Sequence, residues 1–338
     1  MKLIVMCGLP GSGKSTIIEN FIDSLDCPGY FSSDQYRKIL LGDETRQDNN
    51  DLVFKTLYAD LISHLKLGYD AILDATNVTI KSRSKILNLL KNNKLLYNDV
   101  EKICYVVNTP VDVCIERDAA RNRCVGESVI KKFLYQFQCP QYFEGWDKIE
   151  FANPPHFQSI YSDENFALIN ELFYKMDRFK QFNPHHKYSV GEHSLNLFKY
   201  FDGKDKIRAS AGRFHDIGKL YTQQFDDYNI AHYYNHDAVG AYFVLSNPSI
   251  LLEENLDNIL EIIFYINWHM RAHNDINATE KAKKKYVELF GQERYDKLME
   301  FAKADKITSG CSHRYNEIKE YINNLKETGG KYDGRIFK

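Results

Sequence analysis

Gly8-Leu9-Pro10-Gly11-Ser12-Gly13-Lys14-Ser15 follows an apolar run over residues 3–7 and precedes the apolar pair Ile17-Ile18. Its spacing, G-x-x-x-x-G-K-[ST], is that of a P-loop, in which a strand leads through a glycine-rich turn into a helix. Backbone N–H groups of such a turn surround a polyphosphate, and the helix N-terminus adds partial positive charge. The motif predicts that Lys14 reaches the β- and γ-phosphates and that the Ser15 hydroxyl ligates Mg²⁺. The residues expected to bind the nucleotide are Gly8, Gly11, Ser12, Gly13, Lys14, Ser15 and Thr16.

Length and composition indicate an ordinary globular protein. The chain has 338 residues, enough for two domains, with 43% hydrophobic and 27% charged residues. A formal net charge of −2 argues against a globally basic nucleic-acid coat but leaves room for a local basic patch. The 7 cysteines include no C-x-x-C pair, which favours reduced thiols. No apolar stretch is long enough to span a bilayer and no signal segment is recognisable, so we expect a soluble cytoplasmic protein without membrane contact.

Two further predicted strands end in an aspartate. Asp34 follows the short apolar pair Tyr30-Phe31, and Asp74 follows the buried run over residues 69–73. Ligands of open α/β sheets bind at the carboxyl ends of the strands. At such a position Asp34 can accept a proton from an attacking hydroxyl, and Arg37, on the same face of the next helix, can hold a phosphate.

Both aspartates also have a purely structural interpretation. Asp34 could cap a helix beginning at Gln35, and Asp74 could cap the helix predicted over residues 81–90. The residues alone leave the choice for Asp34 open. The strand-end position favours a functional role for Asp74, as a Mg²⁺ ligand through water, with Thr76 and Asn77 touching substrate or phosphate.

A helix predicted over residues 111–121 carries two arginines. Arg117 and Arg121 are four residues apart and so project from one face, and Arg123 lies in the turn beyond. Arginines of this kind usually form a solvated surface. In an enzyme that transfers a phosphoryl group, arginines on a lid stabilise the charge on that group, and the P-loop favours this second interpretation.

The order of these motifs resembles the P-loop kinase domain of polynucleotide 5′-kinases. Ser33-Asp34-Gln35-Tyr36-Arg37 is similar to that family's (S/D)-D-x-Y-R segment, and the two helical arginines match its paired lid arginines. The resemblance covers roughly residues 1–150. It implies that Asp34 is the general base on a 5′-hydroxyl and that Arg37 contacts the phosphate on the 3′ side of the acceptor nucleotide. Val125-Gly126 departs from the Val-Pro that usually follows the lid.

A break near the middle of the chain predicts two domains. Asn153-Pro154-Pro155 interrupts helix and strand patterns alike, and the composition becomes more helical after it. We therefore expect a parallel-sheet α/β domain over residues 1–152 and an all-α domain over residues 153–338. Ser162 is expected to cap a helix over residues 163–179.

The histidines of the second half fall in an ordered set. The doublet His215-Asp216 can supply a nitrogen and a carboxylate to one or two metal ions, and His193 lies 22 residues before it. Any one of these histidines alone would more often be a packed or surface residue. The ordered set instead favours metal ligands over packed or surface residues. Its members are His193, His215, Asp216, His236, His269 and Asp305.

This set, H…HD…H…H…D, resembles the HD phosphohydrolase superfamily, an all-α fold, over roughly residues 180–310. The resemblance implies one or two divalent ions (Mn, Mg, Ni, Fe, Co or Zn). A first ion would be held by His193, His215, Asp216 and Asp305. A second site would be completed by His236 and His269. Lys219 would neutralise a phosphate oxygen during attack by a metal-activated water. Further candidates for phosphate contact are His185, His186, His232, Arg271 and His273.

Together the two resemblances imply a bifunctional enzyme that heals nucleic-acid ends. The first domain would phosphorylate the 5′-hydroxyl of RNA or DNA with ATP or another NTP and Mg²⁺. The second would remove a 2′- or 3′-phosphate or open a 2′,3′-cyclic phosphate, which prepares the ends for a ligase. Two alternatives remain open: a nucleotide or small-metabolite kinase joined to a nucleotidase, and a kinase regulated by a metal-bearing HD sensor without catalysis.

Overall fold

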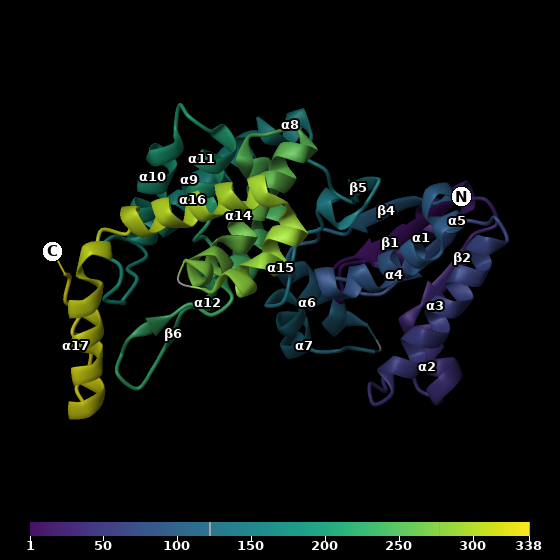
Figure 1. Cartoon of the computed structure of the whole chain (residues 1–338), viewed down its shortest axis with the longest axis horizontal. Helices are drawn as coiled ribbons and strands as arrows, with labels where there is room; N and C mark the ends of the chain where they lie inside the picture. The colour runs from purple at the N-terminus through teal and green to yellow at the C-terminus, as the bar shows by residue number, and fades with distance from the viewer. Residues whose placement is uncertain (122, 277, 338) are drawn as a thin grey trace. The chain divides into compact units, whose positions relative to one another are not determined.

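The computed structural model describes residues 1–121, 123–276 and 278–337 (Figure 1). The chain divides into two compact units, Met1–Pro154 and Pro155–Lys338. Among the described residues, no helix combines the length and the apolar character needed to cross a membrane.

The first unit is a five-stranded parallel sheet with the order β2-β3-β1-β4-β5. Its central strand β1 is buried along Leu3 to Cys7, because helices cover both faces of a parallel sheet. The register pairs Ser32 with Asp74, so the ends of two neighbouring strands lie side by side. The strands are β1 (Lys2–Cys7), β2 (Gly29–Ser32), β3 (Ala71–Asp74), β4 (Glu101–Val106) and β5 (Lys148–Phe151).

Helices follow the strands and flank the sheet, which confirms the predicted α/β architecture of this unit (Figure 1). Two short 3₁₀ segments, Ile22–Ser24 and Tyr142–Glu144, extend the connections. The helices are α1 (Lys14–Phe21), α2 (Ser33–Leu41), α3 (Asn50–Lys66), α4 (Ile80–Asn92), α5 (Lys94–Asp99), α6 (Val111–Ala120) and α7 (Glu127–Leu134).

A buried ion pair connects α4 to the segment before β5. Arg83 donates from Nε to Glu144 Oε2 at 2.7 Å and from Nη2 to Glu144 Oε1 at 2.8 Å, and its side chain is fully buried. Arg83 Nη1 also donates to the carbonyl of Asn77, just beyond β3. Trp146 Nε1 lies 3.4 Å from Glu144 Oε2 and so reports on the pair.

Removal of Arg83 is expected to destabilise this unit strongly. Arg83→Ala leaves Glu144 as an uncompensated buried charge, which costs about 3–5 kcal/mol of unfolding free energy. Urea unfolding followed by Trp146 fluorescence, in a Trp268→Phe background, measures the loss. Lys131→Ala removes an exposed pair with Glu127 and serves as control, with an expected change below about 1 kcal/mol. Equal losses of unfolding free energy in both variants would contradict the stabilising role of the buried pair between Arg83 and Glu144.

The second unit is built of helices with one small hairpin. The helices are α8 (Phe157–Ile160), α9 (Asp163–Arg178), α10 (Val190–Phe201), α11 (Lys206–Phe214), α12 (Lys219–Thr222), α13 (His236–Ser246), α14 (Leu256–Asp275), α15 (Glu280–Phe290), α16 (Gln292–Thr308) and α17 (Tyr315–Thr328). The cap predicted for α9 is confirmed, because Ser162 Oγ accepts the N–H of Asn165 at 3.1 Å.

The expected all-α character of this unit is wrong at one place. Strands β6 (Gln224–Phe225) and β7 (Ala231–His232) pair antiparallel. The carboxylate of Asp226 accepts the N–H groups of Tyr228 and Ile230 at 2.9 Å each, and Asn229 has φ 60°. An aspartate that bonds to the backbone beyond it closes a tight turn, and this turn produces the hairpin.

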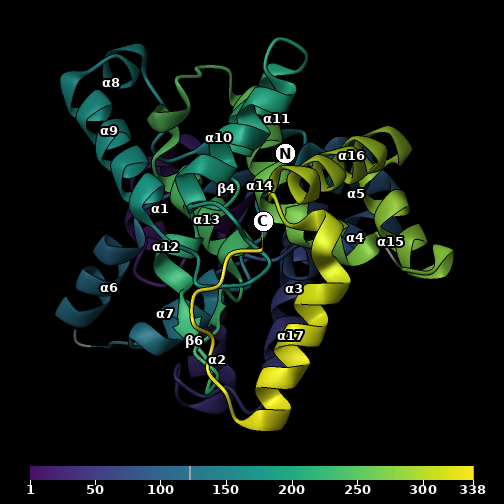
Figure 2. The same ribbon diagram turned by 90° about the vertical axis from the view of Figure 1, so that its left-hand side faces the viewer.

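Helix α14 forms the centre of the second unit. Figure 2 shows it among α10, α13 and α16, and it packs directly on α11, α13 and α16. Most of its length is buried, as expected of a helix that is apolar on several sides. Nearby, α12 and α13 approach closely at Gly218, where a Cβ atom would lie 2.0 Å from the His236 carbonyl oxygen. Only glycine permits this approach, which brings two elements of the histidine cluster together.

Candidate nucleotide site and candidate metal centre

The P-loop connects β1 to α1 through glycines in the left-handed region. Gly11 has φ 78° and Gly13 has φ 95°. A Cβ at Gly11 would lie 2.2 Å from the carbonyl oxygen of Cys114, so only glycine fits there. The N–H of Gly8 is bound by the carbonyl of Thr76 at 2.9 Å, which ties the start of the loop to the segment after β3.

Two polar groups of the loop fit a polyphosphate. Lys14 Nζ donates only to backbone carbonyls of its own loop, those of Gly8 at 3.2 Å and Leu9 at 2.9 Å, among the hydrogen bonds of the described residues. Burial lowers the pKa of Lys14, although Asp74 opposes the effect. The buried hydroxyl of Ser12 has no hydrogen-bond partner within the described part of the chain. A desolvated ammonium group beside an unsatisfied hydroxyl at a helix N-terminus favours an anion.

A carboxylate and two hydroxyls meet at the end of β3. Ser15 Oγ donates to Asp74 Oδ2 at 3.0 Å, and the Tyr30 hydroxyl donates to the same oxygen at 2.6 Å. Burial and this bond raise the pKa of Tyr30 to about 12, so the hydroxyl stays a donor at neutral pH. Helix α4 is capped by Thr79, so the interpretation of Asp74 as its cap is wrong. Oxygen donors in this arrangement fit Mg²⁺.

Thr76 and Asn77 were expected to touch substrate or phosphate, but in the structure they make contacts within the protein. The Thr76 carbonyl accepts the N–H of Gly8, and the buried amide of Asn77 donates to the carbonyl of Met6 at 2.9 Å. Asn77 has φ 46°, a conformation that asparagine tolerates better than most residues. The amide of Asn77 therefore holds the strand end against β1 instead of pointing to a ligand.

Asp34 lies in the first turn of α2, which begins at Ser33, so the interpretation of Asp34 as an N-cap is wrong. Arg37 Nη1 donates to Asp34 Oδ1 at 2.6 Å, and Arg123 Nη1 donates to Asp34 Oδ2 at 2.9 Å. Arg37 is fixed further by Asn50 Oδ1, which accepts from Nε at 3.3 Å and from Nη2 at 3.1 Å. Sequence patterns gave no signal for Asn50 and assigned no role to Arg123.

The two arginines of the predicted lid have different partners. Helix α6 ends at Ala120, so Arg121 lies beyond it and pairs with Asp118, whereas Arg117 Nη1 donates to the carbonyl of Ser12 at 3.3 Å. Asp118 also accepts the N–H groups of the next turn, that of Gly126 at 2.8 Å. Gly126 has φ 89°, which proline cannot adopt, and this explains the departure from Val-Pro.

The six residues of the histidine–aspartate set converge in the buried interior of the second unit. His193 lies on α10, and His215 and Asp216 follow α11. The others begin α13 or lie on α14 and α16: His236, His269 and Asp305. Ligand atoms lie within 4.8 Å of one another in two groups, one of His193, His215 and Asp305 and one of Asp216, His236 and His269.

The imidazole rings are oriented by the backbone. The Nδ1 atoms of His215, His236 and His269 lie 2.9, 2.7 and 2.8 Å from carbonyl oxygens three residues earlier. Since a carbonyl only accepts, each Nδ1 donates its proton there, and each Nε2 faces the cluster and offers it a lone pair when deprotonated. The Nε2 atoms of His236 and His269 are 3.1 Å apart, and those of His193 and His215 are 3.2 Å apart. Lone pairs facing one another at this distance fit a cation between them.

Carboxylates supply negative charge to the same centre. His193 Nε2 lies 2.8 Å from Asp305 Oδ1, and His236 Nε2 lies 3.2 Å from Asp216 Oδ1. Burial alone would raise the pKa of both carboxyls, but His215 and the neighbouring cations outweigh it and hold both well below the usual range. Burial lowers the pKa of His215, yet the two carboxylates outweigh it and raise the value to about 10. Both carboxylates are therefore ionised, the form that ligates a metal ion.

Two side chains, Lys219 and His273, support these carboxylates. Lys219 Nζ lies 2.7 Å from Asp216 Oδ2 and donates to Gln181 Oε1 at 2.9 Å, so the buried ammonium already has an anionic partner. His273 Nε2 lies 2.6 Å from Asp305 Oδ2. The sequence marked His273 as a candidate for phosphate contact, and its position one turn after His269 on α14 is the only signal for the observed role.

The other candidates for phosphate contact divide by their distance from the cluster. His186 Nε2 lies 3.5 Å from Lys219 Nζ and so borders the centre. Three candidates have partners elsewhere: His185 packs its ring against Tyr315, His232 pairs with Asp226, and Arg271 pairs with Asp275.

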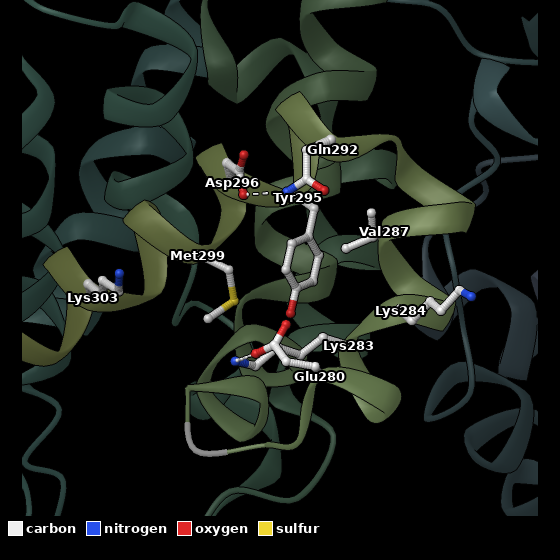
Figure 3. A pocket seen from close by; sticks show the side chains of 9 residues that line it. All are labelled: Glu280, Lys283, Lys284, Val287, Gln292, Tyr295, Asp296, Met299 and Lys303. Atoms are coloured by element: carbon white, nitrogen blue, oxygen red, sulfur yellow. Dashed lines mark hydrogen bonds and ion pairs between the residues drawn. The ribbon is translucent and has the colours of Figure 1, made fainter.

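A cavity of about 510 Å³ lies between α15 and α16, and Figure 3 shows its lining side chains. The Tyr295 ring crosses it toward Glu280, and Lys283 pairs with Glu280 at 2.9 Å. None of the residues predicted for catalysis or binding lines this cavity.

A comparison with protein families matches most of the first unit. Residues 3–140 match the AAA_33 family model, an AAA domain. A relative from Acanthamoeba polyphaga mimivirus, provisionally named a bifunctional polynucleotide phosphatase/kinase, is 30% identical over 157 residues, which cover 44% of this chain. The chain spans about a third (32%) of the length of that relative.

Two solved structures show a partial likeness. A chain of the Pnkp1/Rnl/Hen1 RNA repair complex is 25% identical, with a TM-score of 0.34, over 40% of this chain and 43% of that one. A gluconokinase from Sinorhizobium meliloti 1021 is 17% identical, with a TM-score of 0.31, over 45% of this chain and 84% of that one. At these TM-scores neither likeness bears on function.

Proposed function

We propose that this chain heals nucleic-acid ends with two separate sites. The P-loop unit would transfer the γ-phosphoryl group of ATP, or of another NTP, to a 5′-hydroxyl of RNA or DNA. The histidine–aspartate centre would remove a 2′- or 3′-phosphate or open a 2′,3′-cyclic phosphate. The observation that carries the proposal is the coexistence of Asp34 and Lys14 at the carboxyl end of one sheet with a buried cluster of six histidine and aspartate residues in the same chain. The name of the mimiviral relative supports the kinase half of this proposal.

In the kinase reaction the site residues would exchange their present contacts within the protein for contacts with the substrates. Lys14 would release its own loop carbonyls and bind the β- and γ-phosphates. Asp34 would accept the proton of the 5′-hydroxyl, and Arg37, held by Asn50, would position the phosphate beside it. Ser15 and Asp74 would hold Mg²⁺, which neutralises phosphate charge when bound. The nucleotide would further contact Gly8, Gly11, Ser12, Gly13, Thr16, Arg117 and Arg121.

In the phosphohydrolase reaction the chain would hold the metal-ligating atoms in place before any substrate enters. His193, His215 and Asp305 would hold one divalent ion, and a second would be held by Asp216, His236 and His269. A bound ion lowers the pKa of its water and polarises the phosphoester. Lys219 keeps the Asp216 carboxylate in place and adds positive charge to the centre. The products of both reactions, a 5′-phosphate and a 3′-hydroxyl, are the groups that a nucleic-acid ligase joins.

One experiment separates the proposal from its alternatives. The protein is incubated with ATP, Mg²⁺ or Mn²⁺ and an oligonucleotide with a 5′-hydroxyl and a 3′-phosphate, as RNA and as DNA, and both ends are followed. We expect a gain of phosphate at one end and a loss at the other. Phosphorylation of nucleosides but of no polymer would favour a nucleotide or small-metabolite kinase joined to a nucleotidase. Kinase activity that depends on the metal centre, without phosphate release, would favour a sensor.

His273 is expected to strengthen metal binding through Asp305. In His273→Ala the carboxylate of Asp305 loses its 2.6 Å partner, and loss of such a supporting contact typically weakens metal binding by about 10- to 100-fold. Calorimetric titration of the metal-free protein with Mn²⁺ measures this without any substrate. His232→Gln, which changes a histidine paired with Asp226 outside the cluster, is the control. Unchanged affinity in His273→Ala would refute this role.

A further inference from the structure

Both oxygens of Asp34 are occupied by guanidinium groups. Arg37 holds Oδ1 at 2.6 Å, and Arg123 holds Oδ2 at 2.9 Å. A general base must come within hydrogen-bond distance of the hydroxyl whose proton it removes. An acceptor hydroxyl therefore competes with an arginine for one side of this carboxylate.

The two arginines differ in how firmly they are held. The Arg37 side chain is 9% exposed and is fixed by Asn50 as well as Asp34. The Arg123 side chain is 31% exposed, and within the described part of the chain its partners beyond Asp34 are both on Glu44: the backbone oxygen at 3.1 Å and Oε1 at 3.2 Å. Exposed pairs of this kind have little net stability. Arg123 is therefore the group that can leave Asp34 at low cost.

The backbone around Arg123 holds it opposite Asp34. Asp118, at the end of α6, pairs with Arg121 on one side of Arg123 and accepts the N–H groups of Val125 and Gly126 on the other. This buried aspartate thus anchors the connection at both ends. Release of Arg123 from Asp34 requires only a movement of its own long side chain.

We propose that Arg123 determines acceptor specificity in the kinase reaction, by exchanging Asp34 and Glu44 for a phosphate group of the acceptor. The inference rests on the proposed kinase function. A guanidinium group binds phosphate with two parallel hydrogen bonds, so an acceptor that carries a phosphate compensates Arg123 when it leaves the carboxylate. An acceptor without a phosphate leaves the Arg123 guanidinium unpaired. A water molecule that attacks ATP in place of an acceptor leaves it unpaired as well. Arg123 would then favour phosphate-bearing acceptors over nucleosides and limit the hydrolysis of ATP without acceptor.

The test compares two acceptors, a nucleoside and the corresponding nucleoside 3′-phosphate, in wild type and Arg123→Gln. We expect the preference for the phosphate-bearing acceptor, as a ratio of kcat/KM, to fall about 10- to 100-fold, the range of a charge-assisted hydrogen bond. The KM for the 3′-phosphate should rise, whereas turnover of the nucleoside and hydrolysis of ATP should increase. Arg123→Lys keeps the positive charge but not the planar pair of N–H donors, so it should restore part of the preference.

Arg46→Gln is the matched control. Arg46 is an exposed arginine of the same neighbourhood that pairs with Asp48 and the Leu41 carbonyl but not with Asp34, so its replacement should leave the ratio unchanged. An unchanged ratio in Arg123→Gln, or an equal fall in Arg46→Gln, would overturn the inference while the kinase function stands. If the wild type phosphorylates no acceptor at all, the proposed function is itself wrong and the inference falls with it.

Discussion

Lys14→Ala is expected to abolish 5′-phosphorylation while terminal phosphate release continues at the wild-type rate. Loss of one preorganised charge-stabilising donor costs about 10²–10³ in kcat, and Lys14 would stabilise charge on two phosphates at once. Its present hydrogen-bond partners are the carbonyls of Gly8 and Leu9, and the nearby Asp74 carboxylate keeps its hydrogen bonds from Ser15 and Tyr30 in the alanine variant. Transfer of labelled phosphate from ATP to a 5′-hydroxyl oligonucleotide measures the first activity, and release of inorganic phosphate from a 3′-phosphate measures the second.

Lys81→Ala is the matched control for this experiment, because Lys81 is an exposed lysine at the start of α4. It should leave both activities unchanged. Kinase activity within tenfold of wild type in Lys14→Ala would show that the P-loop lysine does not serve this transfer. Loss of both activities in Lys14→Ala would contradict the model of two independent sites.

Asp216→Asn is expected to have the opposite effect, with phosphate release lost and 5′-phosphorylation retained. The asparagine keeps the shape of the side chain but removes the anion that lies 2.7 Å from Lys219 Nζ and 3.2 Å from His236 Nε2. Loss of a supporting residue around a metal already costs about 10- to 100-fold, and loss of a ligand should exceed this. The content of bound metal, measured on the purified variant, should fall together with the activity.

Because Lys219 loses its anionic partner in Asp216→Asn, folding has to be tested alongside activity. His193→Gln removes another candidate ligand without leaving Lys219 unpaired, and we expect the same separation of activities. Retained kinase activity shows that the first unit is folded, and a cooperative unfolding transition followed by Trp268 fluorescence, in a Trp146→Phe background, tests the second unit. Phosphate release at the wild-type rate in both would show that this centre does not perform the reaction.

Local sequence patterns predicted the elements whose signal lies within a few residues. The P-loop spacing gave the strand, turn and helix around Gly8 to Ser15, and Ser162 gave the start of α9. The order of the histidines predicted a cluster, and the structure brings its six residues together in the interior. These predictions succeed because a motif whose spacing is fixed by its chemistry can be read without knowledge of the fold.

Features that depend on tertiary contact were not predictable. Helical spacing gave no sign that Asp118 pairs with Arg121 and binds the N–H groups of the next turn beyond α6. The contacts of Arg123 with Asp34 and of His273 with Asp305 join residues 89 and 32 positions apart. No periodicity encodes such a separation. The hairpin of β6 and β7 was missed because two-residue strands are too short to show alternation.

The three carbonyls that orient the histidine rings belong to Gly212, Tyr233 and Ile266, each three positions before its histidine. A carbonyl oxygen is present whatever the side chain, so these supports survive replacement of Tyr233 or Ile266 as long as the local turn persists. Point mutation therefore has little effect on the orientation of these rings. The support of Asp305, in contrast, depends on a single replaceable side chain, that of His273. Sequence drift should therefore alter the carboxylates, which His273 and Lys219 support, before it alters the orientation of these rings.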